Sequence, residues 1–294
     1  MQSLLLWWRL PEMLVERLRK QSGLSNKKLT RLAETASVRY KIYTIPKRTG
    51  GVRTIAHPSR ELKAIQRWIN ARLLNTLDIH NSATAYRKGS NIRSNAARHV
   101  ATKFTLRADF KDFFPSFNLY QIAEFLELQN TKNQLDLSDE DIDFVSKIVC
   151  RYGHLTIGAP TSPSLTNVMM FEFDVALNNF AEANNLVYTR YADDLFLSAY
   201  QPNQLEGAMK EIKHLAGEFN FANLVINDKK TAFLSRRYKR SITGVIVTPD
   251  GKLSIGRSRK REIKALIHRF GENTLEPERV AYLSGMLAFS SDVE

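Results

Sequence analysis

Cysteine and long hydrophobic runs are almost missing from this sequence. Cys150 is the one cysteine in 294 residues, so an intrachain disulfide and a cysteine-based zinc site are excluded, and a reducing, cytoplasmic setting is expected. No apolar run approaches the ~20 residues of a membrane-spanning helix, and no membrane partner is expected. The short apolar stretch at residues 4–8 has no basic segment before it and indicates a helix start rather than a signal peptide.

Acidic residues are also scarce relative to basic ones. The chain has 43 Lys and Arg against 30 Asp and Glu, which gives a formal charge of +13. Such an excess concentrates polyanions at the surface, so nucleic acid is the leading expected partner. The hydrophobic share of 43% is typical of a folded protein, and a chain of this length can bury a large core in two or three subdomains.

Hydrophobic periodicity switches repeatedly between helical and strand patterns. Strands are expected over residues 38–56 (a basic hairpin turning at Gly50-Gly51), 104–109, 186–199 (a second hairpin), 223–227, 231–235 and 241–248. Helices are expected over residues 3–36 with a break at Ser22-Gly23, after the N-cap Ser59, and over 118–128, 164–183, 203–219, 257–270 and 276–289. This order predicts an α/β (α+β) fold, a mixed sheet packed on helices.

Two adjacent carboxylates, Asp193 and Asp194, stand between apolar, β-prone segments. The pattern predicts a hairpin with both acids at its tip. Neighbouring carboxylates repel each other and need a compensating cation when buried. A divalent metal that also binds substrate phosphate supplies that cation. The alternative for an isolated pair is a solvated turn, where Asp is common.

A third acid, Asp109, ends the strand expected over residues 104–109. An acid at the end of one strand can meet the hairpin tip of a neighbouring strand. Three carboxylates from two strands can hold two Mg²⁺ ions ~4 Å apart, one activating an attacking hydroxyl and the other stabilising a leaving pyrophosphate. The sequence therefore predicts a two-metal site for phosphoryl transfer at Asp109, Asp193 and Asp194.

Five segments, in this order along the chain, resemble the motifs of reverse transcriptases. Residues 45–63 resemble the bacterial fingers motifs, and Asp109–Phe114 resembles the first carboxylate motif. Gly158–Pro163 with Asn167 resembles the nucleotide-pocket motif, although the family's Gln before it is replaced by Ile157. Tyr191–Asp194 matches the YxDD box, and residues 226–231 resemble the lysine motif. Each motif alone is weak, but their combination is specific.

The resemblance implies a right-hand polymerase with three parts. Fingers with N-terminal helices are expected over residues 1–104, a palm over 105–238 that includes an insertion at 129–156, and a small helical thumb over 239–294. It also implies roles for single residues. Phe110 would offer its backbone carbonyl to the metal, and Phe114 would exclude a 2′-hydroxyl. Further nucleotide-binding residues would be Lys47, Arg53, Gly158 and Lys230, with Lys229 as the alternative lysine.

Two further marks are similar to the retron branch of this family. Asn95-Ala96-Ala97-Arg98-His99 matches the NAxxH signature, and Ile242-Thr243-Gly244 is close to the VTG signature. The likeness implies that Asn95, His99 and Thr243 contact nucleic acid. The alternative for Asn95 and His99 is a helical i, i+4 pair that is satisfied inside the protein.

A basic helix starts near residue 257 and is expected to contact phosphates of a duplex independently of sequence. Its cations are Arg257, Arg259, Lys260 and Arg261, and Arg236, Arg237, Lys239 and Arg240 precede them. The alternative for these residues is a solvated surface.

The retron resemblance implies RNA-templated DNA synthesis by a bacterial enzyme. Its partners would be dNTPs, a structured non-coding RNA that serves as template and priming site, the branched RNA–DNA product and an accessory effector in antiphage defence. Its cofactor would be two Mg²⁺ ions, for which Mn²⁺ can substitute. Three alternatives stay open: another bacterial reverse transcriptase (intron or diversity-generating type), a non-enzymatic scaffold, and a nucleotidyl cyclase.

Overall fold

A computed structural model describes residues 13–47, 50–235, 237 and 239–294. The helix start expected at residues 4–8 and the cation Arg236 lie outside these residues. The chain forms two compact units, one from Met1–Ile79, Asp112–Phe171 and Glu218–Leu224, the other from His80–Lys111, Glu172–Gly217 and Val225–Glu294. The division into fingers, palm and thumb given above stays a prediction, and we describe each unit separately.

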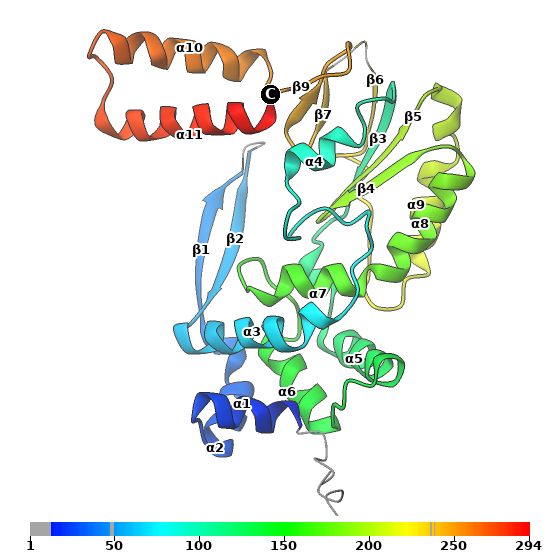
Figure 1. Cartoon of the computed structure of the whole chain (residues 1–294). Helices are drawn as coiled ribbons and strands as arrows, with labels where there is room; N and C mark the ends of the chain where they lie inside the picture. The colour runs from blue at the N-terminus through cyan, green and yellow to red at the C-terminus, as the bar shows by residue number, and fades with distance from the viewer. Residues whose placement is uncertain (1–12, 48–49, 236, 238) are drawn as a thin grey trace, which may run out of the picture. The chain divides into compact units, whose positions relative to one another are not determined.

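The first unit combines a β-hairpin with helices (Figure 1). Strands β1 (Tyr40–Pro46) and β2 (Val52–Pro58) pair antiparallel around the expected turn. As expected, the N-terminal helical segment breaks at Gly23, which has φ 69°, a left-handed conformation that glycine adopts without strain. The helices of this unit are α1 (Leu14–Ser22), α2 (Asn26–Glu34), α3 (Arg60–Arg72), α5 (Leu119–Asn133), α6 (Asp139–Val149) and α7 (Thr161–Met169).

Two caps explain where the longest helices of this unit begin. The hydroxyl of Ser59 accepts a hydrogen bond from the amide of Leu62 and starts α3. Asn118 forms a capping box with Gln121 and starts α5. Each cap satisfies backbone donors that a helix start leaves unpaired. Both were predicted from the sequence, although α5 continues to Asn133 rather than ending near residue 128.

The second unit contains a four-stranded antiparallel sheet in the order β4-β5-β3-β6. Its strands are β3 (Phe104–Asp109), β4 (Val187–Tyr191), β5 (Asp194–Ala199) and β6 (Ala232–Ser235). Leu106, Leu195 and Leu197 are completely buried in its core. Helix α8 (Phe171–Ala183) is bonded to β4, because the carboxylate of Asp174 accepts hydrogen bonds from Tyr188 and Arg190. Helix α9 (Ala208–Gly217) also belongs to this unit.

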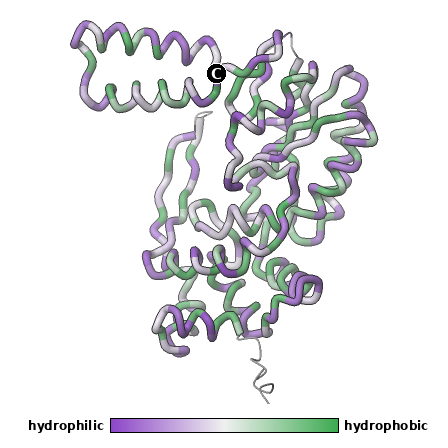
Figure 2. The backbone as a smooth tube through the Cα atoms, in the orientation of Figure 1, coloured by the Kyte–Doolittle hydropathy of each residue, from purple (hydrophilic) through white to green (hydrophobic). Residues whose placement is uncertain are grey.

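A smaller sheet and three helices complete the second unit. The sheet has the order β7-β8-β9, formed by β7 (Arg240–Ile242), β8 (Val245–Val247) and β9 (Leu253–Ser254). Helices α10 (Arg257–Gly271) and α11 (Pro277–Val293) run side by side (Figure 1), and α4 (Ile92–Ala97) contacts the small sheet. One hydrophobic cluster joins these elements to Phe196 of β5. Hydrophilic residues interrupt hydrophobic ones all along α10 (Figure 2), as expected for a helix with one packed face.

Short 3₁₀ turns connect several of these elements. They lie at Ala36–Val38, Leu74–Thr76, Phe114–Ser116 and Pro202–Leu205. None of the helices in the described part of the chain is long and apolar enough to cross a lipid bilayer.

The structure corrects four of the predicted elements. The helix expected over 164–183 is two helices, α7 and α8, and the hydroxyl of Thr166 bonds the carbonyl of Ser162, an interaction that bends helices. Residues 223–227 form no strand, only a bridge between Phe110 and Ile226. The helix expected over 203–219 starts at residue 208, after a 3₁₀ turn and Gly207. The strand expected over 241–248 is the β7–β8 hairpin.

Candidate active site

The tip of the β4–β5 hairpin carries the two adjacent acids, as predicted. Tyr191 pairs with Asp194 across the strands, so Ala192 and Asp193 form a two-residue loop. Ala192 has φ 56°, a left-handed conformation that costs an L-residue roughly 1–2 kcal/mol. Strain of this kind is retained where the surrounding structure holds it and is frequent at functional sites.

Asp109 lies directly beside this tip. It is the last residue of β3 and the register partner of Asp194, the first residue of β5. The next amide, that of Phe110, donates to the carbonyl of Asp193 at 3.0 Å. The Phe110 ring is buried and packs edge-on against Phe173, with centroids 5.7 Å apart. The structure therefore brings together the three acids that the sequence singled out, through the end of one strand and the turn of its neighbour.

Each of two acids is paired with a cation. The Nζ of Lys230 lies 2.8 and 2.9 Å from the two carboxylate oxygens of Asp109. Asp109 is only 2% exposed. The Nε of Arg107 donates to Oδ1 of Asp194 at 3.1 Å. Of the two candidate lysines, Lys230 is the one that contacts an acid of the cluster. We call Asp109, Asp193 and Asp194, with Lys230 and Arg107, the carboxylate site.

Two acids of the carboxylate site, Asp193 and Asp194, have a pKa that is raised by burial. Burial, followed by the charges of Asp194 and Asp109, raises the pKa of Asp193 to about 6. Burial also raises the pKa of Asp194, against the lowering effect of Arg107. Both shifts mean that the ionised forms are disfavoured, and additional positive charge would stabilise them.

Residues 225–227 hold Lys230 in position beside β3. The amide of Lys111 donates to the carbonyl of Val225, and the amide of Asn227 donates to the carbonyl of Asp109. The amide of Lys230 then closes a turn on the carbonyl of Asn227 at 3.0 Å. The lysine motif therefore reaches Asp109 through backbone pairing at the end of the strand.

A buried ion pair, which we call the Arg190–Asp174 brace, stabilises the β4–β5 hairpin next to its loop. Arg190 and Asp174 are completely buried, and their closest atoms, Nη2 and Oδ2, are 2.6 Å apart. The hydroxyl of Tyr188 donates to the same carboxylate. Arg190 also donates through Nη1 to the carbonyl of Ala192, at 3.2 Å. The pair is thus connected directly to the strained loop that carries Asp193.

Sequence reasoning missed Arg107 and the Arg190–Asp174 pair. A signal existed for Arg107, because it stands two residues before Asp109 and alternate residues of a strand share a face. It lies opposite Phe196, which makes Asp194 its diagonal neighbour across the strands. The Arg190–Asp174 pair joins a strand to a helix and has no local pattern of that kind.

The expected nucleotide-binding residues other than Lys230 lie in the first unit. Lys47 and Arg53 are exposed on the β1–β2 hairpin. Phe114 is partly exposed while Phe113 is buried, as expected for the pair, but the cause is a 3₁₀ turn and not strand alternation. Gly158 has φ 115°, and a Cβ there would lie 2.6 Å from the carbonyl oxygen of Ala56 on β2. Close backbone packing therefore requires glycine at this position.

The NAxxH and VTG segments meet inside the second unit. Asn95 and His99 are completely buried. The ring nitrogens of His99 contact the hydroxyls of Ser198 and Thr189, at 2.6 and 2.8 Å. The amide nitrogen of Asn95 donates to the Thr243 hydroxyl at 3.4 Å. Both nitrogens of the His99 ring are thus bonded inside the protein, as the alternative expects, but His99 lies beyond the end of α4 and the side-chain oxygen of Asn95 has no hydrogen-bond partner among the described residues. Direct contact with nucleic acid stays a prediction.

The basic residues of α10 divide into two groups. Arg259 donates to the carbonyl of Gly244 and lies 5.3 Å from the Phe289 ring centroid, and Lys260 pairs with Glu294 at 2.8 Å. Arg257 and Arg261 are exposed and have no ion pair among the described residues. Arg240 was grouped with the surface cations, but it is completely buried and donates to the carbonyls of His99 and Thr102. That interpretation of Arg240 was wrong.

Comparisons with known proteins agree with this geometry. The family model of reverse transcriptases, described as RNA-dependent DNA polymerases, matches residues 45–270. The retron Ec83 and Ec86 reverse transcriptases of Escherichia coli are 34% and 33% identical, over 90% and 94% of this chain and 86% and 83% of the relatives. The retron Mx162 reverse transcriptase of Myxococcus xanthus is 32% identical, over 93% of this chain and 62% of the relative.

Solved structures show the same fold at low identity. A telomerase from Candida albicans, in complex with a fragment of telomeric RNA, has a TM-score of 0.54 and 14% identity, over 80% of this chain and 50% of that one. An apo telomerase from Candida tropicalis has a TM-score of 0.53 and 15% identity, over 80% of this chain and 59% of that one. These neighbours are consistent with a right-hand polymerase.

The chain belongs to the reverse transcriptase family and has its right-hand polymerase fold. Within that family it is a reverse transcriptase of the retron type, an RNA-directed DNA polymerase. The family match decides against the nucleotidyl cyclase, and the retron relatives decide against the intron and diversity-generating alternatives.

Membership of this family implies a divalent metal cofactor, and the carboxylate site suits one. Its donors are carboxylate oxygens, which Mg²⁺ prefers, and two of its acids are already held by cations. The three acids lie side by side, but among the described residues no three acidic, histidine or cysteine side chains are arranged as a metal site.

Proposed function

We propose that this chain copies part of a structured non-coding RNA into DNA and primes from an internal 2′-hydroxyl of the same RNA, which yields a branched RNA–DNA molecule. The observation that carries the proposal is the register pairing of Asp109 with Asp194 beside the loop at Asp193. A scaffold that only held RNA would not need three carboxylates side by side, two of which, Asp193 and Asp194, have a raised pKa.

In this proposal Asp109, Asp193 and Asp194 bind two Mg²⁺ ions, for which Mn²⁺ can substitute. The ions supply activation of the attacking hydroxyl and charge stabilisation of the leaving pyrophosphate. The protein holds the acids in place through β3, the hairpin loop and the Arg190–Asp174 brace. Phe110 is proposed to add its backbone carbonyl to the metal ligands.

Lys230 has a second part in the proposal. Its ammonium group is half exposed while it contacts a buried carboxylate, so it can move from Asp109 to the pyrophosphate when a metal takes its place. There it donates a proton or a charged hydrogen bond. Lys47 and Arg53 are proposed to hold the triphosphate, and Phe114 to select deoxynucleotides. Gly158 is proposed to let its loop pack closely against β2 at the nucleotide site.

The same proposal includes nucleic acid as the partner of the thumb and a defence role. The RNA template, the DNA product and the dNTPs are all anionic, which fits the charge of +13. Thr243 and the exposed Arg257 are proposed to contact nucleic acid, whereas Asn95 and His99 support the region around Thr243 from inside. An accessory effector and antiphage defence in the cytoplasm complete the proposal, on the resemblance to retrons.

The test is to purify the protein from its host and sequence the nucleic acid that accompanies it. An Asp193→Asn, Asp194→Asn variant and an Asp78→Asn control are purified in parallel; Asp78 is an exposed acid in the first unit. DNA joined to RNA through a 2′–5′ branch, present in the wild type and the control but missing from the double variant, supports the proposal. RNA without DNA in all samples would favour the scaffold.

A further inference from the structure

Four buried polar side chains form a network across the sheet that carries the acids. The ring nitrogens of His99 contact the hydroxyl of Ser198 on β5, at 2.6 Å, and that of Thr189 on β4, at 2.8 Å. The Ser198 hydroxyl also lies 3.0 Å from the hydroxyl of Thr105 on β3. All four residues are completely buried. We call them the His99 network, and it links three of the four strands of the sheet.

Each strand of the His99 network also leads to one acid of the carboxylate site. Four positions separate the hydroxyl from the acid in every case; the pairs are Thr105 and Asp109, Ser198 and Asp194, and Thr189 and Asp193. Along β3 and β5 this separation is about 13 Å, at ~3.3 Å per residue. Residues four positions apart on a strand share one face of the sheet. The network and the acids are therefore two levels on the same three strands.

The hydrogen bonds of the His99 network are satisfied without a charge. A neutral imidazole has one donor and one acceptor, and a hydroxyl can serve as either. Burial, with the charges of Arg240 and Arg98, lowers the pKa of His99 to about 3, so the ring is neutral at pH 7. Each ring nitrogen therefore has a hydroxyl partner that can supply the matching role.

Packing alone does not require polar groups at this level of the sheet. On β5 the residue between the network and Asp194 is Phe196, whose buried ring lies 6.1 Å from the His99 ring. Apolar residues of the same shape replace a satisfied polar network at little cost in stability. Hydrogen bonds, however, fix distance and direction and specify one arrangement of a core. The His99 network therefore determines how the three strands lie relative to one another.

We infer that His99 is a positioning residue for DNA synthesis, because it fixes the three strands that hold the acids of the carboxylate site. His99 touches no reacting atom and acts through Thr189 and Ser198. A misplacement of about 1 Å can lower a rate about 100-fold, so a small shift of one strand affects the reaction. The inference gives the histidine of the NAxxH segment a part in the chemistry. It rests on the proposed function of the three acids.

The test separates the hydroxyl group of Thr189 from its shape. Thr189→Val keeps the shape of the side chain and removes the hydroxyl, whereas Thr189→Ser keeps the hydroxyl and removes a methyl group. Extension of a DNA primer on an RNA template gives kcat and the KM for dNTP, and urea unfolding gives the stability of each variant. The control is Ile148→Val, which trims a completely buried residue of the first unit, outside the His99 network.

Thr189→Val is expected to lower kcat about tenfold to a hundredfold, while the KM for dNTP changes less than about threefold. Thr189→Ser is expected to keep kcat within about threefold of the wild type, because its hydroxyl still reaches the His99 ring. Ile148→Val should lose stability and keep kcat. Wild-type kcat in Thr189→Val, equal losses in the two Thr189 variants, or an equal loss in the control would each overturn the inference.

A second variant covers the case in which Thr189→Val leaves the His99 ring unpaired and does not fold. It combines His99→Leu, Thr105→Val, Thr189→Val and Ser198→Ala, which removes all partners of the network together. This variant is expected to unfold near the urea midpoint of the wild type and still to lose kcat about tenfold to a hundredfold. Wild-type kcat in the folded variant would overturn the inference. Failure to fold would assign the network to the fold alone and overturn it as well.

A further variant, Asp193→Asn, separates this inference from the proposed function. It is measured in the same primer extension. Loss of extension in Asp193→Asn, together with wild-type kcat in Thr189→Val, would contradict the inference and leave the proposed function intact. Wild-type extension by Asp193→Asn would contradict the proposed function of the acids, on which the inference rests.

Discussion

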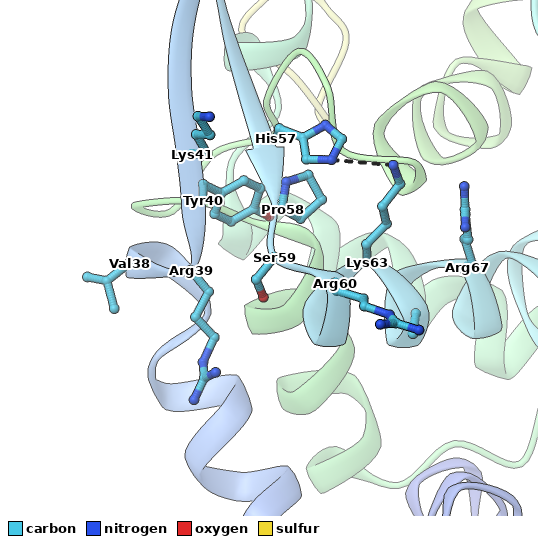
Figure 3. Close-up of a pocket in the computed structure, with 11 residues that line it drawn as sticks. Val38, Arg39, Tyr40, Lys41, His57, Pro58, Ser59, Arg60, Lys63 and Arg67 are labelled. Atoms are coloured by element: carbon cyan, nitrogen blue, oxygen red, sulfur yellow. Dashed lines mark hydrogen bonds between the residues drawn. The ribbon is translucent and has the colours of Figure 1, made fainter.

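The carboxylate site and the basic pocket, a cavity at the base of the β1–β2 hairpin (Figure 3), treat charge in opposite ways. The basic side chains that line this pocket are Arg39, Lys41, His57, Arg60, Lys63 and Arg67. In the carboxylate site Asp109 is buried and bonded to Lys230, and Asp194 is bonded to Arg107. In the basic pocket Arg60 and Arg67 are exposed and have no ion pair among the described residues. A buried charge without a partner costs several kcal/mol, whereas an exposed one is solvated. The charges of Asp109 and Asp194 are therefore compensated inside the protein, whereas those of Arg60 and Arg67 are compensated by solvent.

The largest expected effect is on chemistry at the carboxylate site. Asp193→Asn should lower DNA synthesis at least about 10³-fold, because it removes an oxygen ligand that a metal needs in the transition state. Primer extension measures this effect. In metal-free buffer the same change should raise the free energy of unfolding, since at pH 7 the ionised carboxylate is held against a pKa raised to about 6.

The gain in stability distinguishes an acid kept for function from one kept for the fold. It should amount to roughly 1–3 kcal/mol, measured by urea unfolding with a chelator present. Asp78→Asn serves as the control and should change neither activity nor stability. A variant at Asp193 that is less stable than the wild type would contradict the electrostatic description of the carboxylate site.

The second effect concerns the buried brace below the loop. Asp174→Ala should lower the free energy of unfolding by about 3–5 kcal/mol, because it leaves the Arg190 guanidinium buried without its partner. Asp143→Ala breaks an exposed i, i+4 pair with Lys147 and should cost less than about 1 kcal/mol. The midpoints and slopes of urea unfolding measure both. Similar costs for the two variants would mean that burial does not separate them.

The sequence predicted the parts of the fold and of the carboxylate site that depend on local pattern. The hairpin at Asp193, the strand that ends at Asp109 and the caps at Ser59 and Asn118 all follow from alternation and turn chemistry over a few residues. The family resemblance predicted Lys230 near the leaving pyrophosphate, which stays a prediction; in the structure Lys230 contacts Asp109.

The features that sequence reasoning missed depend on packing between distant segments. The Arg190–Asp174 pair joins residues 16 positions apart on different elements. Arg240 looked like one more surface cation, yet it is buried against carbonyls of the loop after α4. Neither contact leaves a periodic mark in the chain, because burial of a single side chain is decided by the tertiary neighbours around it.

The third effect is a dependence of stability on pH. Burial, with the nearby charges of Arg240 and Arg98, lowers the pKa of His99 to about 3 from a usual value of 6.5. The folded state therefore excludes the proton that the unfolded chain binds below pH 6.5. Stability is full above that pH and should fall by roughly 1.4 kcal/mol per unit as the pH drops towards 3.

The variant His99→Gln isolates this contribution from the carboxylates that also titrate in acid. It should be less stable at pH 7, since the hydrogen bonds to Ser198 and Thr189 change, but its stability should fall less steeply between about pH 6.5 and 4.5. Urea unfolding at several pH values gives both slopes. Equal slopes would mean that His99 is protonated in the folded protein.

The fourth effect tests why glycine stands at position 158. Gly158→Ala should cost about 2–4 kcal/mol, because the backbone is left-handed and the new Cβ would meet the carbonyl of Ala56. Gly153→Ala is the matched control: φ is 78° there and nothing lies within 4 Å of the added carbon, so it should cost only about 1 kcal/mol. Thermal or urea unfolding compares the two variants. Equal losses of stability would mean that the contact with β2 is not the reason for glycine at position 158.

The smallest effect compares an unpaired cation with a paired one on α10. Arg257 is exposed without an ion pair in the described residues, whereas Lys260 is held by Glu294. Arg257→Gln should weaken binding of an RNA–DNA duplex a few-fold and lower the salt slope by roughly 0.7–0.9. Lys260→Gln should change the slope less, because its charge is already compensated and binding releases fewer counterions. If both substitutions lowered the slope equally, pairing with Glu294 would not persist in the complex, and an internal partner would be no obstacle to phosphate binding at an exposed position.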